Sequence, residues 1–212
     1  MQDIMSGALF FPEETRENIL LLMHSVRGNG QIVAKIDPVS LQCPNPKHIR
    51  CDSIVWGVLT VAKYIAETGD RQLLDVDVAD YEGKKASVLE LLLRGMRFSG
   101  SNTGIHGLPK LFDCDWNDLL VIISAIHHDG ESVMVGMLYI VAAKILIGML
   151  DPAAHAEEIA FLKRKIADFS QVLDSTAVWD GEWYRRLLFP DAVMGSARNS
   201  EPPGAFRAGY ES

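Results

Sequence analysis

The sequence is poor in cysteine and lacks any surplus of positive charge. Its 212 residues include 3 cysteines, Cys43, Cys51 and Cys114, and none are spaced as Cys-x-x-Cys. This pattern disfavours both a disulfide framework and a zinc site, so we expect reduced thiols in a cytoplasmic protein. The formal net charge of −8 disfavours a nucleic-acid partner, because nothing would neutralise a phosphate backbone. A neutral or anionic small substrate remains compatible if local Arg or His groups receive it.

The sequence also lacks the marks of export and of membrane insertion. No basic region followed by an apolar run stands at the N-terminus, so we expect no signal peptide. The apolar run 133–150 is about long enough to cross a bilayer, but Lys144 in its middle would be costly in lipid. The polar residues that flank this run are typical of helix ends. We therefore expect a buried helix and no membrane partner.

What the sequence does contain is a succession of helical patterns. Hydrophobic residues make up 48% and charged residues 23%, which is typical of a globular protein. Apolar residues recur at helical spacing in five segments. The first begins near Pro12, and the others span residues 52–68, 85–98, 131–150 and 153–174. The stretch 31–51 contains two prolines and predicts a long loop, which in a compact domain is often functional.

The order of these segments predicts an all-α fold built from α-hairpins. Such hairpins either stack as a solenoid or close into an α/α toroid. The absence of a fixed-period repeat disfavours a TPR-type or HEAT-type array. The aromatic, glycine-containing segment that follows predicts a short rim hairpin near residues 179–196, and residues 201–212 predict a loose C-terminal tail.

The segment 115–118 (Asp-Trp-Asn-Asp) holds the groups most typical of a sugar site. A carboxylic acid can protonate a glycosidic oxygen, an indole can stack on a pyranose, and an amide can bind hydroxyls. The alternative is a helix start, with an Asp as the N-cap and the Trp in the core. Adjacent histidines at 127 and 128 do not face each other on a helix, and they have no carboxylate cluster nearby, so no metal site is expected.

Motifs around this segment make the chain resemble glycoside hydrolase family 94, the inverting cellobiose-type phosphorylases formerly classed as glycosyltransferases. Asp52-Ser53-Ile54-Val55-Trp56 resembles a barrel-helix motif of that family, and Gly107-Leu108-Pro109 precedes the Asp-Trp-Asn-Asp core as it does there. Gly-Glu-Ser-Val at 130–133 and Trp-Asp-Gly-Glu-Trp-Tyr at 179–184 follow in the family order. Each motif alone is weak, but five in order across residues 2–200 are specific.

The resemblance implies a fold and a reaction. Residues 1–200 would form part of an (α/α)6 toroid, as in six-hairpin glycosidases. The parent activity would be phosphorolysis of a β-linked glucose disaccharide to α-glucose 1-phosphate. Its partners would be a sugar and inorganic phosphate as co-substrate, with no organic or metal cofactor. A homodimer, as in the family, is also implied.

The resemblance also assigns roles within the segment 115–118. It places the general acid at Asp115, held protonated by a partly dry site. Asp118 would be secondary, either a helix cap or a support for the loop that also contacts substrate. Trp116 would stack on the sugar or pack in the barrel core.

Three further residues complete the expected substrate site. Asp3 matches a sugar-hydroxyl-binding aspartate of the family, although the Arg and Asp that precede it there are absent here. Trp183 and Arg186 would line the acceptor side, with a packing role as the alternative.

The sequence departs from the family at both ends. Met1 stands inside the family's Arg-Asp-x-x-Gln-Asp motif, whose end Gln2-Asp3 resembles. The sequence also diverges after Glu201, beyond which the family's phosphate-binding residues would follow. We therefore expect a truncated barrel with little activity alone. Two alternatives remain open: a glycoside hydrolase or cyclic-glucan-processing module that uses water, and a non-catalytic helical remnant.

Overall fold

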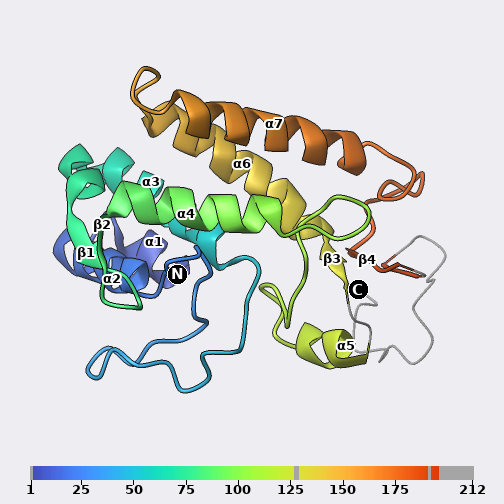
Figure 1. The fold of residues 1–212 in the computed structure, drawn as a ribbon, viewed down its shortest axis with the longest axis horizontal. Helices are drawn as coiled ribbons and strands as arrows, with labels where there is room; N and C mark the ends of the chain where they lie inside the picture. Colours follow the sequence, from blue (N-terminus) through green and yellow to red (C-terminus); the bar gives the residue numbers. More distant parts are fainter. Residues whose placement is uncertain (1, 127–128, 191, 196–212) are drawn as a thin grey trace.

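The computed structural model describes residues 2–126, 129–190 and 192–195. Within them lie seven α-helices, one short 3-10 helix and two small β-sheets (Figure 1). The helices are α1 (Gln2–Gly7), α2 (Pro12–His24), α3 (Ser53–Thr68), η1 (Arg71–Asp75), α4 (Val88–Ser101), α5 (Leu120–Ile126), α6 (Val133–Met149) and α7 (Ala156–Leu173). The protein is therefore mainly helical, as the sequence predicted, but it also contains strands that the helical periodicity did not reveal.

Helix α3 lies at the centre of the helical body and contacts α1, α2, α4 and α6. Its apolar side chains recur at helical spacing, so Val55, Val58 and Val61 are fully buried against these neighbours. Gly69 ends the helix in the left-handed region at φ 74°, which glycine adopts without strain. The central position of α3 fixes the start of the chain, the α2–α3 loop and α4 relative to one another.

Helix α6 carries apolar side chains around almost its whole circumference. Neighbouring helices cover it on several sides. It forms a hairpin with α7 across the top of the molecule and also contacts α3 and α4 (Figure 1). Lys144 reaches the surface. Among the described residues, no helix combines the length and the apolarity that a bilayer crossing requires.

The strands form two small antiparallel sheets. The pair β1 (Asp77–Ala79) and β2 (Lys85–Ser87) leads directly into α4. The second sheet has the order β3 (Glu131–Ser132), β4 (Leu187–Leu188) and β5 (Val193–Met194). The β4–β5 hairpin lies within the range 179–196 where a hairpin was predicted. The tail 201–212 lies outside the described residues.

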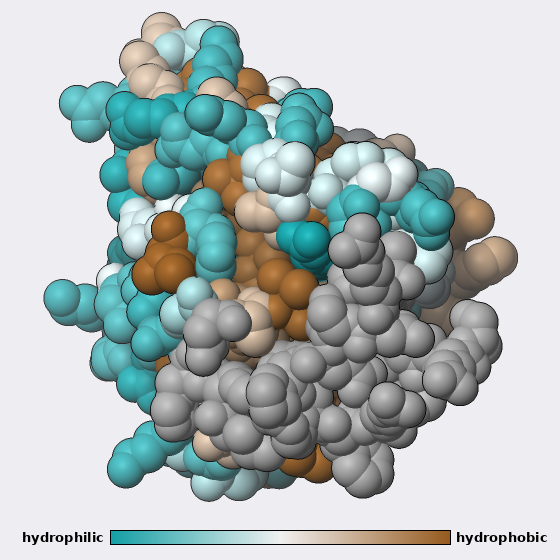
Figure 2. All heavy atoms as spheres, turned by 90° about the vertical axis from the view of Figure 1, so that its right-hand side faces the viewer, coloured by the Kyte–Doolittle hydropathy of each residue, from teal (hydrophilic) through white to brown (hydrophobic). Residues whose placement is uncertain are grey.

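Two clusters of buried apolar side chains hold these elements together. The larger one joins α2, α3, α4, α6 and α7. The smaller one gathers Leu111, Leu120 and Phe189 beneath the segment 115–118. Figure 2 faces the end of the molecule that carries α5 and β4, and it shows hydrophobic atoms at the surface between polar ones. The smaller cluster contains Cys114 and Leu120, so it holds the chain on both sides of the segment 115–118.

Candidate active site

Backbone hydrogen bonds hold the segment 115–118 from two directions. Just before it, the Cys51 N–H donates to the Cys114 carbonyl at 2.9 Å, which pairs this segment with the end of the α2–α3 loop. Further upstream, the Leu111 N–H donates to the Gly130 carbonyl at 2.7 Å, next to β3. Because these partners are distant in sequence, the fold and not the local pattern sets the direction of each side chain.

The Asp115 side chain is fully buried and points into the protein. Its Oδ1 accepts a hydrogen bond from the Arg186 guanidinium at 2.6 Å, and its Oδ2 accepts one from the Ser132 hydroxyl at 2.7 Å. The Asn117 N–H adds a third bond to Oδ1 at 3.0 Å. Ser132 pairs with Leu187 across β3 and β4, so Arg186 lies beside it. Asp115 therefore anchors the segment and has no surface that a substrate could touch.

The Asp118 side chain has the opposite environment and is 74% exposed. Its Oδ1 lies 3.0 Å from the Arg50 guanidinium, which also donates to the carbonyl oxygens of Asp115 and Trp116 at 3.3 and 3.5 Å. Trp116 is 57% exposed, so the alternative that placed it in the core is wrong. The segment therefore directs its first carboxylate inward and its indole and second carboxylate outward.

A cavity of about 450 Å³ adjoins this outward face. Its volume lies in the range of about 300–1,000 Å³ that is usual for small-molecule sites. The wall contains residues of α1, α2, the α2–α3 loop, the start of α3, and the indole of the segment 115–118. The polar and aromatic members are Asp3, Asn18, Ser25, Lys35, Arg50, Asp52, Ser53, Trp56 and Trp116. This mixture of indoles, carboxylates and cations suits a polar ligand with flat apolar faces, such as a sugar.

Asp52 forms part of the rigid back of the cavity. It accepts a hydrogen bond from the Trp56 indole at 2.9 Å, and its carboxylate lies 4.0 Å from the Arg50 guanidinium. Burial raises the pKa of Asp52, while Arg50 and the Trp56 hydrogen bond oppose that rise. The hydrogen bond between Trp56 and Asp52 fixes the direction of the Trp56 ring.

The family model described as the glycosyl hydrolase 94 superfamily catalytic domain matches residues 1–206 of the chain. The chain belongs to this family. The resemblance inferred from the motifs is therefore confirmed, and the segment 115–118 lies inside the matched region.

Several curated proteins align with most of this chain through a small part of their own length. The N,N'-diacetylchitobiose phosphorylase of Vibrio furnissii is 31% identical over 66% of this chain and 17% of its own. The cellobionic acid phosphorylase of Neurospora crassa is 27% identical over 92% of this chain and 24% of its own. The cyclic β-(1,2)-glucan synthase of Rhizobium meliloti is 27% identical over 71% of this chain and 6% of its own. The chain therefore spans less than a quarter of the length of each of these relatives.

The glycosyl hydrolase 94 chain brings together only part of the predicted substrate site. Asp3 and Trp116 both line the cavity, and Asp118 adjoins it through Arg50. Trp183 is 46% exposed on the turn before β4 and does not line this cavity. Arg186 does not line it either, because its guanidinium is bound to Asp115. Of the two roles left open for Arg186, the structure favours packing.

Sequence reasoning missed two cations that line the cavity, Lys35 and Arg50. The signal that could have found them was the prediction that the loop 31–51 is functional, because both residues lie in it. No group of three or more His, Cys, Asp or Glu side chains suited to a metal ion occurs in the part of the chain that the structure describes. The adjacent histidines at 127 and 128 lie outside that part.

Proposed function

We propose that this chain contributes the acid-bearing part of a carbohydrate phosphorylase site. The supporting observation is the cavity that joins Asp3 and Trp116 next to the exposed carboxylate of Asp118. The parent reaction would be the inverting phosphorolysis of a β-linked glucose disaccharide such as cellobiose. The helices around α3 would form part of an (α/α)6 toroid. Family membership supports this reaction class.

The geometry favours Asp118 over Asp115 as the general acid. A general acid must reach within hydrogen-bond distance of the glycosidic oxygen. Asp115, to which the resemblance gave this role, is fully buried and bound by Arg186 and Ser132. Asp118 is exposed beside the cavity, so a substrate can approach it without any opening of the protein. Asp115 then serves to position the segment that carries the acid.

The proposed step needs one proton donor. A phosphate oxygen bonds to the anomeric carbon while the bond from that carbon to the glycosidic oxygen breaks, and the glycosidic oxygen takes the proton of Asp118. The products are α-glucose 1-phosphate and the free second sugar. Because phosphate is already anionic, no second carboxylate is needed to activate a water. Donation requires the Asp118 carboxylate to take up a proton from solvent and to leave Arg50, which lies 3.0 Å away.

The remaining cavity residues suit sugar binding. The exposed Trp116 ring offers a flat surface for the C–H face of a pyranose. Asp3 stands on α1 at the cavity wall, where its carboxylate can accept hydrogen bonds from sugar hydroxyls. These two roles match those that the resemblance predicted.

The decisive experiment compares Asp118→Asn with Asp115→Asn. Phosphate-dependent formation of glucose 1-phosphate from cellobiose is measured at high protein concentration and long incubation, because the truncated barrel is expected to have little activity alone. The melting temperature and cellobiose binding by calorimetry are measured beside it. We expect Asp118→Asn to lower kcat at least about 100-fold while the chain stays folded. Asp115→Asn should lower the melting temperature instead. Full turnover in Asp118→Asn would return the acid role to Asp115, and a parent chain that neither turns over nor binds cellobiose would refute the proposal.

A second candidate is a module that processes cyclic glucans or hydrolyses glycosides with water. The similarity to the cyclic β-(1,2)-glucan synthase of Rhizobium meliloti favours it. Product analysis with and without phosphate separates the two, because only a phosphorylase yields a sugar phosphate. Free glucose alone, formed at the same rate in both conditions, would favour the second candidate.

A further inference from the structure

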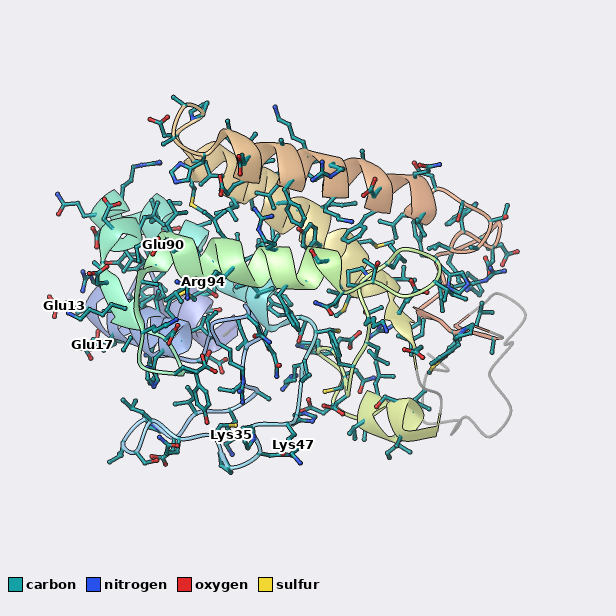
Figure 3. All side chains as sticks on the ribbon, viewed as in Figure 1. Glu13, Glu17, Lys35, Lys47, Glu90 and Arg94 are labelled. Carbon is teal, nitrogen blue, oxygen red and sulfur yellow. The ribbon has the colours of Figure 1, made fainter. Side chains whose placement is uncertain are left out.

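Four side chains form a continuous series of contacts that ends at Asp118. The Asp113 carboxylate lies 3.4 Å from Nδ1 of the His48 ring. His48 Nε2 lies 3.7 Å from the sulfur of Cys114, and the Cys114 thiol donates to Oδ1 of Asp118 at 4.0 Å. His48 follows Lys47, which Figure 3 labels where the α2–α3 loop approaches the segment that carries α5. The proposed reaction uses only the last of these four side chains.

A carboxylate, an imidazole and a thiol in this order can also activate a cysteine nucleophile. Such a nucleophile must reach its substrate as a thiolate. Cys114 is only 1% exposed, and burial raises the pKa of its thiol from 9.0 to about 11. The thiol therefore stays protonated at neutral pH and has no surface that a substrate could reach. It acts as a hydrogen-bond donor and not as a nucleophile.

The sulfur of Cys114 is held in place from two sides. The Asp113 carboxylate accepts a hydrogen bond from the Ile49 N–H at 2.7 Å, so the backbone fixes it. Because this carboxylate faces Nδ1 of the His48 ring, the other ring nitrogen is turned towards the sulfur. The backbone of Cys114 is fixed as well, since its carbonyl accepts a hydrogen bond from the Cys51 N–H. The thiol therefore reaches Asp118 from a constant direction.

Arg50 and Cys114 contact the same oxygen of Asp118. The Arg50 guanidinium lies 3.0 Å from Oδ1, and the Cys114 thiol also donates to Oδ1. The second oxygen, Oδ2, is left for the glycosidic oxygen. When Oδ2 carries a proton, the carboxyl is neutral and its charge attraction to Arg50 is lost. The uncharged thiol can still donate to Oδ1, which is then a carbonyl oxygen.

We propose that the Cys114 thiol, held by His48 and Asp113, positions the protonated carboxyl of Asp118 for donation to the glycosidic oxygen. This inference rests on the proposed function, since it assumes that Asp118 is the general acid. Cys114 acts through Asp118 and is therefore a positioning residue. The Asp118 side chain is 74% exposed, so without such a contact its neutral carboxyl would be free to rotate. Proton donation depends on this orientation.

Phosphorolysis of two substrates at high protein concentration and long incubation tests the inference. Cellobiose needs a proton on its leaving oxygen, whereas dinitrophenyl β-glucoside releases a stable phenolate that needs none. In Cys114→Ala we expect kcat for cellobiose to fall about fivefold, which corresponds to one net hydrogen bond, while KM stays within about twofold. The rate with the dinitrophenyl glucoside should not change. Cys51→Ala is the matched control, because it truncates a buried cysteine of the same cluster and should change neither rate.

The S–H stretching band in the infrared spectrum supplies a readout that needs no turnover. Its frequency depends on the hydrogen bond that the thiol donates, and Cys114→Ala identifies the band by removing it. We expect this band to shift in Asp118→Ala, which removes the acceptor, while the bands of the other cysteines stay in place. An unchanged Cys114 band would show that the thiol does not bind Asp118, and the inference would be refuted.

The kinetic outcomes separate the inference from the proposed function. If Cys114→Ala leaves cellobiose turnover intact, or slows both substrates equally, the inference is refuted while the proposed function stands. The same holds if Cys51→Ala slows cellobiose turnover as much as Cys114→Ala does. If the parent chain binds cellobiose but turns over neither substrate, the infrared result alone decides the inference. A parent chain that neither turns over nor binds cellobiose refutes the proposed function together with the inference.

Discussion

At the residue scale, the two carboxylates of the segment 115–118 lie in opposite environments although they are only three positions apart in the sequence. Asp115 is fully buried and ion-paired with Arg186, whereas Asp118 is mostly exposed and paired with Arg50. A buried charge is tolerated only when hydrogen bonds and an opposite charge compensate the loss of water. The two side chains therefore have different tasks, one in holding the segment and one at the surface where chemistry is possible.

Removing the partner of the buried carboxylate should destabilise the protein strongly. Arg186→Gln leaves the Asp115 charge buried without its ion pair, and we expect a loss of about 3–5 kcal/mol in the free energy of unfolding. Asp118→Asn breaks an exposed pair in the same segment and should cost less than about 1 kcal/mol. Urea denaturation of both variants measures the difference. Equal losses would show that the Asp115 pair is not the anchor.

The buried thiol of Cys114 predicts a loss of stability at high pH. Burial raises the pKa of Cys114 from its ordinary value of 9.0 to about 11. Between these two values the unfolded chain releases a proton that the folded chain keeps, so stability must fall as the pH rises through this window. Urea unfolding at pH 8 and pH 10.5 measures the fall. Cys114→Ala should unfold more easily at both values but show a smaller drop, and an unchanged drop would contradict this account.

At the scale of elements, helical periodicity located the long helices but could not locate the short ones. The segment predicted at 131–150 is α6 at Val133–Met149, and the one predicted at 153–174 is α7 at Ala156–Leu173. Their length and apolar spacing suffice to reveal them. The helices α1 and α5 have six and seven residues and no clear stripe, and their stability comes from tertiary contacts.

The same limit explains which parts of the site were predictable. The residue types of the segment 115–118 marked it as functional. The burial of Asp115 depends on Arg186, which lies 71 positions away and reaches it only through the pairing of β3 and β4. No local pattern contains that contact. The cavity likewise joins α1, α2, a loop and α3, so the position of Lys35 at its wall emerges only in the folded chain.

Two serine caps at the starts of helices allow a matched test at this scale. Ser87 caps α4 in a capping box with Glu90, and Ser132 caps α6 by accepting a hydrogen bond from the Val135 N–H. Ser132 also donates to the buried carboxylate of Asp115. We expect Ser87→Ala to cost about 1 kcal/mol and Ser132→Ala about 2–3 kcal/mol, because the second change also removes a bond to a buried charge.

Chemical denaturation of the two variants decides this prediction. The fold around α6 should remain, so far-ultraviolet circular dichroism serves as the control for helix content. If Ser132→Ala costs no more than Ser87→Ala, the Ser132–Asp115 bond contributes nothing beyond the cap.

At the scale of the whole molecule, net charge and exposed apolar side chains have opposite effects on the association of two copies of the chain. The charge of −8 makes copies of the chain repel one another. The turn between α1 and α2 nevertheless exposes three large apolar side chains in succession, Leu9, Phe10 and Phe11. A contiguous apolar patch of this kind favours association, since burial of its surface is the main driving force for contact. The homodimer that the family resemblance implies stays a prediction that this patch makes testable.

We expect weak self-association that grows stronger with salt. Salt screens the repulsion between exposed charges beyond about 8 Å at physiological strength, while the apolar contact remains. Sedimentation velocity at low and high NaCl measures the association constant. Phe10→Ser removes a ring that is 73% exposed and should weaken association. Val39→Ser alters an apolar residue that is 91% exposed on the α2–α3 loop, outside the turn 9–11, and should not. A chain that is monomeric in all conditions, or that responds equally to both changes, would show that this patch does not join two copies.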